Sequence, residues 1–230
     1  MPFLVADVVD EPPNPWLSWT YVTDHVDTLV AAGKEHLVIT LASVALAMVV
    51  AVPLALLVRR YPGLRGWVLG LGGVLYTIPA LALISVLWPV FGLSPLTVTI
   101  ALAVYALLVV LRNTLVGLDG VPAEAVDAAR GMGFGRRRLL LKVELPLALP
   151  AILAGLRLAT VSTVGLVTIG ALVGHGGFGT LILGGFVDNF YHAQIMTATL
   201  LTVALAIVLE GLLLLLERAL TPWSRARSAS

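Results

Sequence analysis

Long apolar runs separated by short polar segments dominate this chain. A helix needs about 20 apolar residues to cross the hydrocarbon core of a membrane. Five segments meet this condition to differing degrees, at residues 37–58, 67–90, 95–112, 147–173 and 195–216. The third begins at Pro95, which is tolerated at the first position of a helix because the missing N–H would be unpaired there anyway. The pattern predicts an all-α membrane protein with about five transmembrane helices.

Residues 15–33 follow a different pattern. Asp24, His25 and Asp27 interrupt any membrane span, while the apolar residues form one helical stripe: Trp16, Trp19, Val22, Val26, Leu29 and Val30. A helix with one apolar and one charged face is typical of the membrane interface. We therefore expect an N-terminal interfacial helix within an acidic extracytoplasmic segment, residues 1–36, which holds Lys34 as its one cation.

Cations indicate the orientation of the chain, because Lys and Arg favour the cytoplasmic side of short loops. They gather between the first and second spans, between the third and fourth, and after the fifth: Arg59, Arg60 and Arg65; Arg112, Arg130, Arg136, Arg137, Arg138 and Lys142; Arg218, Arg225 and Arg227. Five crossings place all three groups inside only if the N-terminus is outside. We expect a transmembrane domain over 37–220, a cytoplasmic loop over 118–146 and a cytoplasmic basic tail over 221–230.

Composition excludes several classes of function. The chain has 230 residues, 59% hydrophobic and 12% charged, with a mean hydropathy of +1.02; soluble domains carry about a quarter charged residues. It has no cysteine, and its four histidines show no metal-ligand spacing, so we expect no metal site. It also lacks a phosphate-binding GxxxxGK[ST] motif and any recognisable nucleophile and base. We expect no enzymatic activity and no nucleic-acid partner.

The loop between the third and fourth spans carries a spaced motif. Asp127 is followed by Ala128 and Ala129. Gly133 comes after three intervening residues, Val143 after nine more, and then Leu145 and Pro146. Pro122 can begin a short helix, with Glu124 favourably near its positive end. Ala125, Ala128 and Ala129 would form a flat face for close approach of another protein. Gly131 and Gly133 would end this helix, and Arg136 would begin a second one.

This spacing resembles the EAA loop of permease subunits in binding-protein-dependent ABC importers, with Asp127 where Glu is more usual. The resemblance extends to YTIPALALISVL (76–87), ALLVVLRNT (106–114), LPLALPAILAGLRLATV (145–161) and TIGALVGHGGFGTLILGGF (168–186). Over residues 37–220 these segments are similar to permeases of glycine betaine/carnitine/choline importers. The resemblance implies a type I importer permease fold in a bacterial inner membrane and an osmoprotectant as the substrate.

The resemblance also implies partners and a division of roles. A separate ATPase subunit would bind ATP and Mg, and this chain would hold no cofactor. The ATPase would dock on a cytoplasmic coupling helix, with Glu124, Ala125, Asp127, Ala128, Ala129, Gly133, Arg136, Leu145 and Pro146 as coupling residues. A separate extracytoplasmic protein would deliver the substrate, and a second permease subunit, identical or homologous, would complete the path.

Alternatives remain at this point. The chain could serve an ABC importer for another small polar solute, such as an amino acid. A secondary transporter would be expected to show internal repeats and ion sites on broken helices. A purely structural membrane anchor is a further class.

Polar residues inside the apolar segments complete the list of candidates. Tyr76, Thr77 and Thr168 are candidates for lining a substrate path. Arg157 and Glu210 would each cost about 2.5–3.5 kcal/mol near the bilayer centre, so we expect them to compensate each other.

The stretch Gly174–Gly179 satisfies GxGxxG, yet lacks the strand that a dinucleotide site requires, and we expect a flexible outer loop there.

Overall fold

The computed structural model describes residues 14–223, and within this range it is helical without strands. The predicted acidic segment before residue 14, and the basic tail from residue 224, lie outside it. The elements are α1 (Trp19–Asp24), α2 (Val26–Arg60), η1 (Pro62–Leu64), α3 (Arg65–Thr77), α4 (Ala80–Phe91), α5 (Pro95–Asp119), α6 (Ala123–Gly131), α7 (Arg136–Leu139), η2 (Leu140–Glu144), α8 (Leu145–Val167), η3 (Thr168–Val173), α9 (Phe178–Val187) and α10 (His192–Leu220).

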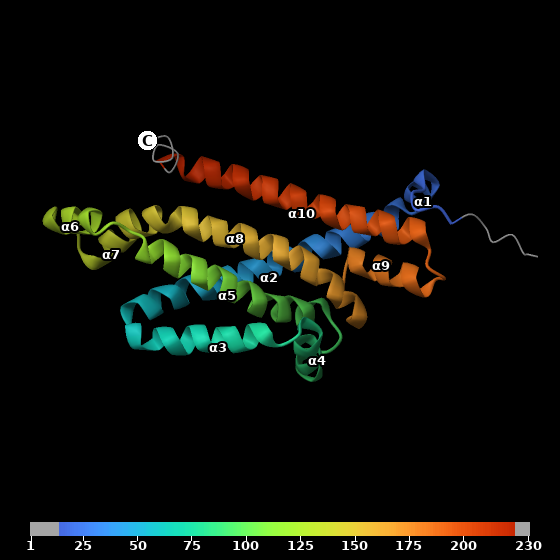
Figure 1. The fold of residues 1–230 in the computed structure, drawn as a ribbon, viewed down its shortest axis with the longest axis horizontal. Helices are drawn as coiled ribbons and strands as arrows, with labels where there is room; N and C mark the ends of the chain where they lie inside the picture. Colours follow the sequence, from blue (N-terminus) through green and yellow to red (C-terminus); the bar gives the residue numbers. More distant parts are fainter. Residues whose placement is uncertain (1–13, 224–230) are drawn as a thin grey trace, which may run out of the picture.

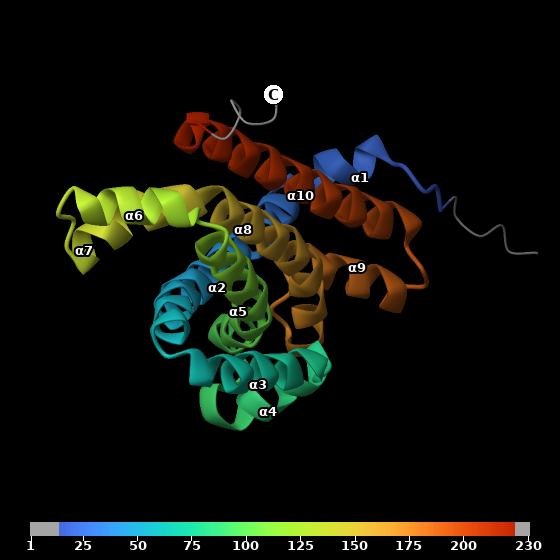
Figure 2. The ribbon, with the colours of Figure 1, turned by 60° about the vertical axis from the view of Figure 1, so that its left-hand side comes forward.

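Helix α5 is the centre of the bundle. It lies against α2 and α8, with α3 and α4 on another side, whereas α9 and α10 lie beyond α8 (Figures 1 and 2). One core cluster joins small residues of α2, such as Ala51 and Ala55, to Leu111 and Leu115 of α5 and Ile152 of α8. A second cluster joins the other half of α5 to α4. The core of the described chain is therefore built around one central helix.

The predicted spans correspond to four long apolar helical segments, Val26–Arg60, Pro95–Asp119, Arg136–Val173 and His192–Leu220, and one bent pair, α3 and α4. The predicted span over 67–90 consists of two helices, which meet at an angle of 97°. Ile78 has extended backbone, φ −67° and ψ 128°, as expected for a residue before proline, whose ring disfavours the helical region there. Pro79 thus divides the second span.

The N-terminal region also differs from the prediction. The expected interfacial helix over 15–33 is divided at His25, where the backbone leaves helical geometry. The short helix α1 is capped by Ser18, whose Oγ accepts a hydrogen bond from the Tyr21 N–H at 3.2 Å. Residues from Val26 onward belong to α2, whose 35 residues extend about 52 Å at 1.5 Å per residue. The first long helix therefore begins well before the predicted residue 37.

The glycine-rich stretch, expected to be a flexible outer loop, is packed against α2. It is a tight turn between η3 and α9, with Gly174 at φ +82° and Gly177 at φ +54°. Gly177 lies so close to α2 that a Cβ atom there would be 2.5 Å from His36 Cβ and 2.8 Å from the Ala32 carbonyl oxygen. The neighbouring His175 donates from Nδ1 to Glu35 Oε1 at 2.9 Å. The turn is therefore held against α2.

His36 of α2 is fully buried. Its Nε2 donates to the Val164 carbonyl oxygen at 2.9 Å. This hydrogen bond joins α2 to α8.

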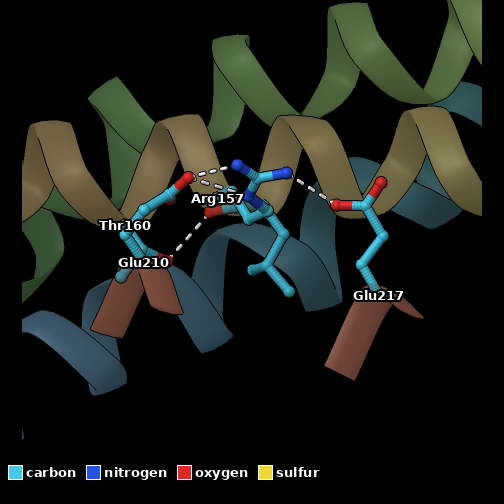
Figure 3. Close-up of polar contacts among 5 residues, drawn as sticks. Arg157, Thr160, Glu210 and Glu217 are labelled. Atoms are coloured by element: carbon cyan, nitrogen blue, oxygen red, sulfur yellow. Dashed lines mark hydrogen bonds and ion pairs between the residues drawn. The ribbon is translucent and has the colours of Figure 1, made fainter. Parts of the chain in front are cut away.

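Arg157 of α8 lies between two carboxylates of α10 (Figure 3). Its Nε donates to Glu210 Oε1 at 3.0 Å, and its Nη1 donates to Glu217 Oε2 at 2.8 Å. The sequence analysis predicted that Arg157 and Glu210 compensate each other, but it did not predict the contact of Arg157 with Glu217. The side chains are partly exposed, at 26% for Arg157, 36% for Glu210 and 21% for Glu217, so the cluster lies at the edge of the α8–α10 contact.

The three groups of described cations lie at one end of the molecule. The α2–α3 turn, the α6–α7 segment and the C-terminal end of α10 all lie towards this end, while α1 and α9 lie at the other end (Figure 1). Asp24, Glu35 and Asp188 are at the second end. This distribution favours the expected orientation, with α6 and α7 in the cytoplasm.

The orientation predicts the labelling of single cysteines in a chain that has none of its own. Gly135→Cys, in open space at the α6–α7 end, should resist an impermeant thiol reagent in intact cells and react after permeabilisation. Asp188→Cys, exposed at the opposite end, should react in intact cells. The reverse pattern would overturn the orientation. Gly177 is unsuitable for this purpose because a side chain there would collide with α2.

The charge cluster predicts a non-additive effect on stability. Arg157→Met leaves two neighbouring carboxylates without their cation, so it should destabilise the chain by about 2 kcal/mol, between the values for exposed and buried ion pairs. The triple variant Arg157→Met/Glu210→Gln/Glu217→Gln should be more stable than Arg157→Met alone. Thermal unfolding in detergent measures both, with Arg137→Met on the exposed loop as the control. A triple variant no more stable than Arg157→Met alone would show that the three groups do not interact.

Candidate functional site: the α6–α7 loop

The short helix α6 follows from local sequence signals. Pro122 precedes the helix with extended backbone, Glu124 lies in the first turn and Arg130 in the last, so both charges oppose the helix dipole favourably. Asp127 and Arg130 form an ion pair of 3.6 Å on the exposed surface. Such an exposed pair contributes at most about 1 kcal/mol. The predicted helix is present over Ala123–Gly131.

Gly133 ends α6 through a hydrogen-bonded turn. Its φ of +79° is the left-handed conformation that glycine adopts without steric cost. The Gly133 N–H donates to the Arg130 carbonyl oxygen at 2.9 Å, and the Phe134 N–H donates to the Ala129 carbonyl oxygen at 3.0 Å. These two bonds are the pair that defines a Schellman motif. The glycine therefore has a backbone role in turning the chain towards α7.

The chain returns to the bundle through α7 and η2. The Arg138 guanidinium lies 4.1 Å from the centroid of the Phe134 ring, a cation–π contact. The segment η2 is a π-helix over Leu140–Glu144. This form is rare in proteins overall, and where it occurs it is frequently at a functional site. It directly precedes Leu145 and Pro146, where Pro146 has no N–H to donate to the preceding turn. The half-buried pair Leu145 and Pro146 thus marks the beginning of α8.

Two ion pairs hold the base of the loop to other helices. Arg59, at the end of α2, donates to Glu144 Oε1 at 3.0 Å. Arg65, at the beginning of α3, lies 2.8 Å from Asp119 Oδ2. Sequence reasoning assigned no role to Asp119 or Glu144, although both are acidic residues that bracket a basic loop. The α6–α7 loop is therefore connected at both ends to the first two spanning segments.

The exposed face of α6 differs from the predicted one. Ala129 is only 1% exposed, so it packs within this chain and cannot face another protein, and Ala125 is half-buried. Glu124, Asp127 and Ala128 are exposed, as is Arg136. The three alanines lie on more than one side of a helix of nine residues. Of the three alanines expected to form the docking face, only Ala128 is exposed, and the charged Glu124, Asp127 and Arg130 are exposed on the same helix.

The three candidate path residues lie in two places. Tyr76 and Thr77 are exposed at the C-terminal end of α3, beside the bend. Thr168 is half-buried where α8 ends and η3 begins, and its hydroxyl donates to the Gly165 carbonyl oxygen at 2.7 Å. Thr77 likewise donates to the Val74 carbonyl oxygen, at 2.7 Å. The described contacts do not bring Thr168 together with the other two.

Comparison with known structures shows the fold. The chain matches a subunit of the methionine ABC transporter MetNI with a TM-score of 0.78 and 23% identity, over 86% of this chain and 98% of that one. It also matches an amino acid ABC transporter with a TM-score of 0.73 and 17% identity, over 88% and 99% of the two chains. The fold is therefore that of type I ABC importer permeases.

Comparison with characterised proteins shows closer relatives. The glycine betaine/carnitine/choline transport system permease protein OpuCD of Bacillus subtilis is 36% identical over 203 residues, 88% of this chain and 89% of that protein. The osmoprotectant import permease protein OsmW of Salmonella typhimurium is 36% identical over 207 residues, 88% and 96% of the two. The family model for the binding-protein-dependent transport system inner membrane component matches residues 38–222. The chain belongs to this family of inner membrane components of binding-protein-dependent transport systems.

Proposed function

We propose that this chain is the membrane-spanning permease subunit of an ATP-driven importer for quaternary ammonium osmoprotectants such as glycine betaine, carnitine and choline. The observation that carries the substrate class is the similarity to several permeases with these names, at 33–36% identity over most of the chain. The likeness to methionine and amino acid transporters is below 25% identity and supports the fold alone. An amino acid as the substrate is the alternative that the uptake experiment below tests.

Energy for transport would come from a partner. A separate ATPase subunit would bind ATP and Mg, and this chain would make no catalytic contribution. A separate extracytoplasmic protein would select and deliver the solute. A second permease subunit, identical or homologous, would complete the path, with lipid around the pair. The chain would lie in a bacterial inner membrane with its N-terminus outside and its C-terminus in the cytoplasm.

The α6–α7 loop suits the transmission of movement from the ATPase. Its docking surface would be the exposed face of α6 with Glu124, Asp127 and Ala128, together with Arg136. The Schellman motif at Gly133 and the Arg138–Phe134 contact stiffen the loop internally. The Arg59–Glu144 and Arg65–Asp119 pairs connect its base to α2 and α3. A displacement of α6 would therefore move the spanning helices rather than bend the loop.

Uptake by the complete complex tests the proposed substrate. In vesicles loaded with ATP-regenerating enzymes, the complex with its ATPase and binding protein should accumulate labelled glycine betaine, choline or carnitine. Vesicles without ATP serve as the control. Accumulation of an amino acid with none of the three quaternary ammonium solutes would contradict the substrate class. Accumulation that does not need ATP would indicate a secondary transporter.

Two glycines of the loop form a matched pair for testing coupling. Gly133 and Gly135 both have open space around them, but only Gly133 has a positive φ. Gly133→Ala should therefore strain the backbone by about 1–2 kcal/mol and reduce ATPase-dependent uptake several-fold. Gly135→Ala, at φ −66°, should transport normally. Equal activity of the two variants would remove the argument that the left-handed turn positions α6.

The exposed face of α6 predicts a docking defect. Ala128→Trp should leave the permease folded and inserted, since Ala128 points away from its own chain. It should weaken co-purification of the ATPase, because bulk at this point prevents close approach, whereas Ala128→Ser should retain it. Ala129→Trp should instead destabilise the permease itself, because this position is buried. Normal ATPase binding by Ala128→Trp would exclude this face from the contact.

A further inference from the structure

The bend between α3 and α4 lies beside the middle part of the spanning helix α5. The carbonyl oxygen of Ile78 accepts a hydrogen bond from the Tyr105 hydroxyl. Tyr105 is the eleventh of the 25 residues of α5, a helix that spans the bundle. The bend therefore lies at nearly half the height of α5. In Figure 1 it is seen where α4 turns away from the direction of α3.

The residues at this bend are exposed on the surface of the chain. Tyr76 is 47% exposed, and Thr77 and Pro79 are also exposed. Two of the last four carbonyl groups of α3 are bonded at the bend, that of Val74 by the Thr77 hydroxyl and that of Leu75 by the Ile78 N–H. The end of a helix leaves the others without an intrahelical partner. In hydrocarbon each such group costs several kcal/mol, so irregular backbone at membrane depth occurs only where protein covers it or where it lines a water-filled cavity. The exposed bend therefore cannot face lipid.

The groups at the bend can attract a cation although none of them carries a charge. The C-terminal end of α3 carries the negative end of the helix dipole. The Tyr76 ring adds a π face, and it is oriented by an edge contact with the Tyr105 ring, at 5.7 Å between centroids and 64° between planes. Between residues 66 and 91 the sequence contains no charged residue. Attraction would therefore come from dipoles and an aromatic ring alone.

Tyr105 is suited to hold this arrangement rather than to contact a solute. It is only 7% exposed, and its hydroxyl is engaged by the Ile78 carbonyl group. The hydrogen bond occupies one carbonyl group of the bend and fixes the ring behind Tyr76. Tyr76 is left as the aromatic residue of this pair with an open surface.

We propose that the Tyr76 ring and the carbonyl end of α3 form a weak transit site for the quaternary ammonium group of the transported solute. This inference rests on the proposed function. A quaternary ammonium has no N–H to donate, so an aromatic face and carbonyl oxygens are the groups that attract it. A single ring without a carboxylate binds weakly, and a solute in transit must leave again. The bend then faces the aqueous path.

Variants at Tyr76 separate the ring from the hydroxyl. Tyr76→Phe keeps the ring, so uptake of glycine betaine should stay within about twofold of the unmodified complex. Tyr76→Leu removes the ring, and uptake should fall about five- to tenfold, the scale of one cation–π contact. ATP hydrolysis stimulated by the loaded binding protein should change little in Tyr76→Leu, since docking and closure of the ATPase are remote from this site. Trp67→Leu is the matched control, an exposed aromatic residue on the same helix, and should transport normally.

Ring electronics give a second measurement that does not depend on how well Tyr76→Leu assembles. Fluorinated phenylalanines at position 76 weaken the negative face of the ring in steps while preserving its shape. Uptake should fall progressively with the number of fluorine atoms. Equal uptake across the fluorinated series, normal uptake by Tyr76→Leu, or a defect in Tyr76→Phe as large as that of Tyr76→Leu would each overturn the proposed site. Absence of quaternary ammonium uptake by the unmodified complex would instead contradict the proposed function.

Discussion

Backbone N–H and C=O groups have no water to bond with inside a membrane, and the rest of this structure depends on that constraint. Each long apolar segment is helical because a helix satisfies its backbone groups internally. Departures from helical geometry at membrane depth therefore need a reason. At Ile78 the Tyr105 hydroxyl supplies one missing bond, and between η3 and α9 the turn is packed on α2.

Close packing of small residues determines where the α6–α7 loop leaves the membrane. A Cβ atom on Gly117 would lie 2.7 Å from the Ala148 carbonyl oxygen, and one on Gly155 would lie 2.9 Å from Asn113 Cγ. Helices approach this closely only where one surface lacks side chains. The end of α5 and the beginning of α8 are thus adjacent, so the loop between them leaves and re-enters the bundle at one place. The Arg59–Glu144 and Arg65–Asp119 pairs then connect this place to α2 and α3.

Helix α10 is held in a different way. Few of its residues are fully buried, among them Ala193, Ala198 and Leu209, and many others are only half-buried. The Arg157 cluster joins its inner half to α8 with directed hydrogen bonds. The exposed apolar residues of α10, such as Leu212 and Leu215, are suited to lipid or to a second subunit. Charged contacts here add to the apolar packing of a helix that the core does not enclose.

Local signals in the sequence were sufficient for much of the architecture. Apolar length predicted the spanning segments, and Pro95, Pro122 and Gly133 marked the beginning or end of helices, because each of these residues restricts or frees its own backbone whatever surrounds it. The motif spacing of the α6–α7 loop identified the family. The tertiary structure alone decided which side of α6 is open, leaving Ala128 exposed and Ala129 buried. It also decided that Glu217 joins Arg157 and that Tyr105 closes the bend at Ile78. Those contacts join residues far apart in the chain, and no periodicity along one helix encodes which neighbour its side chains will meet.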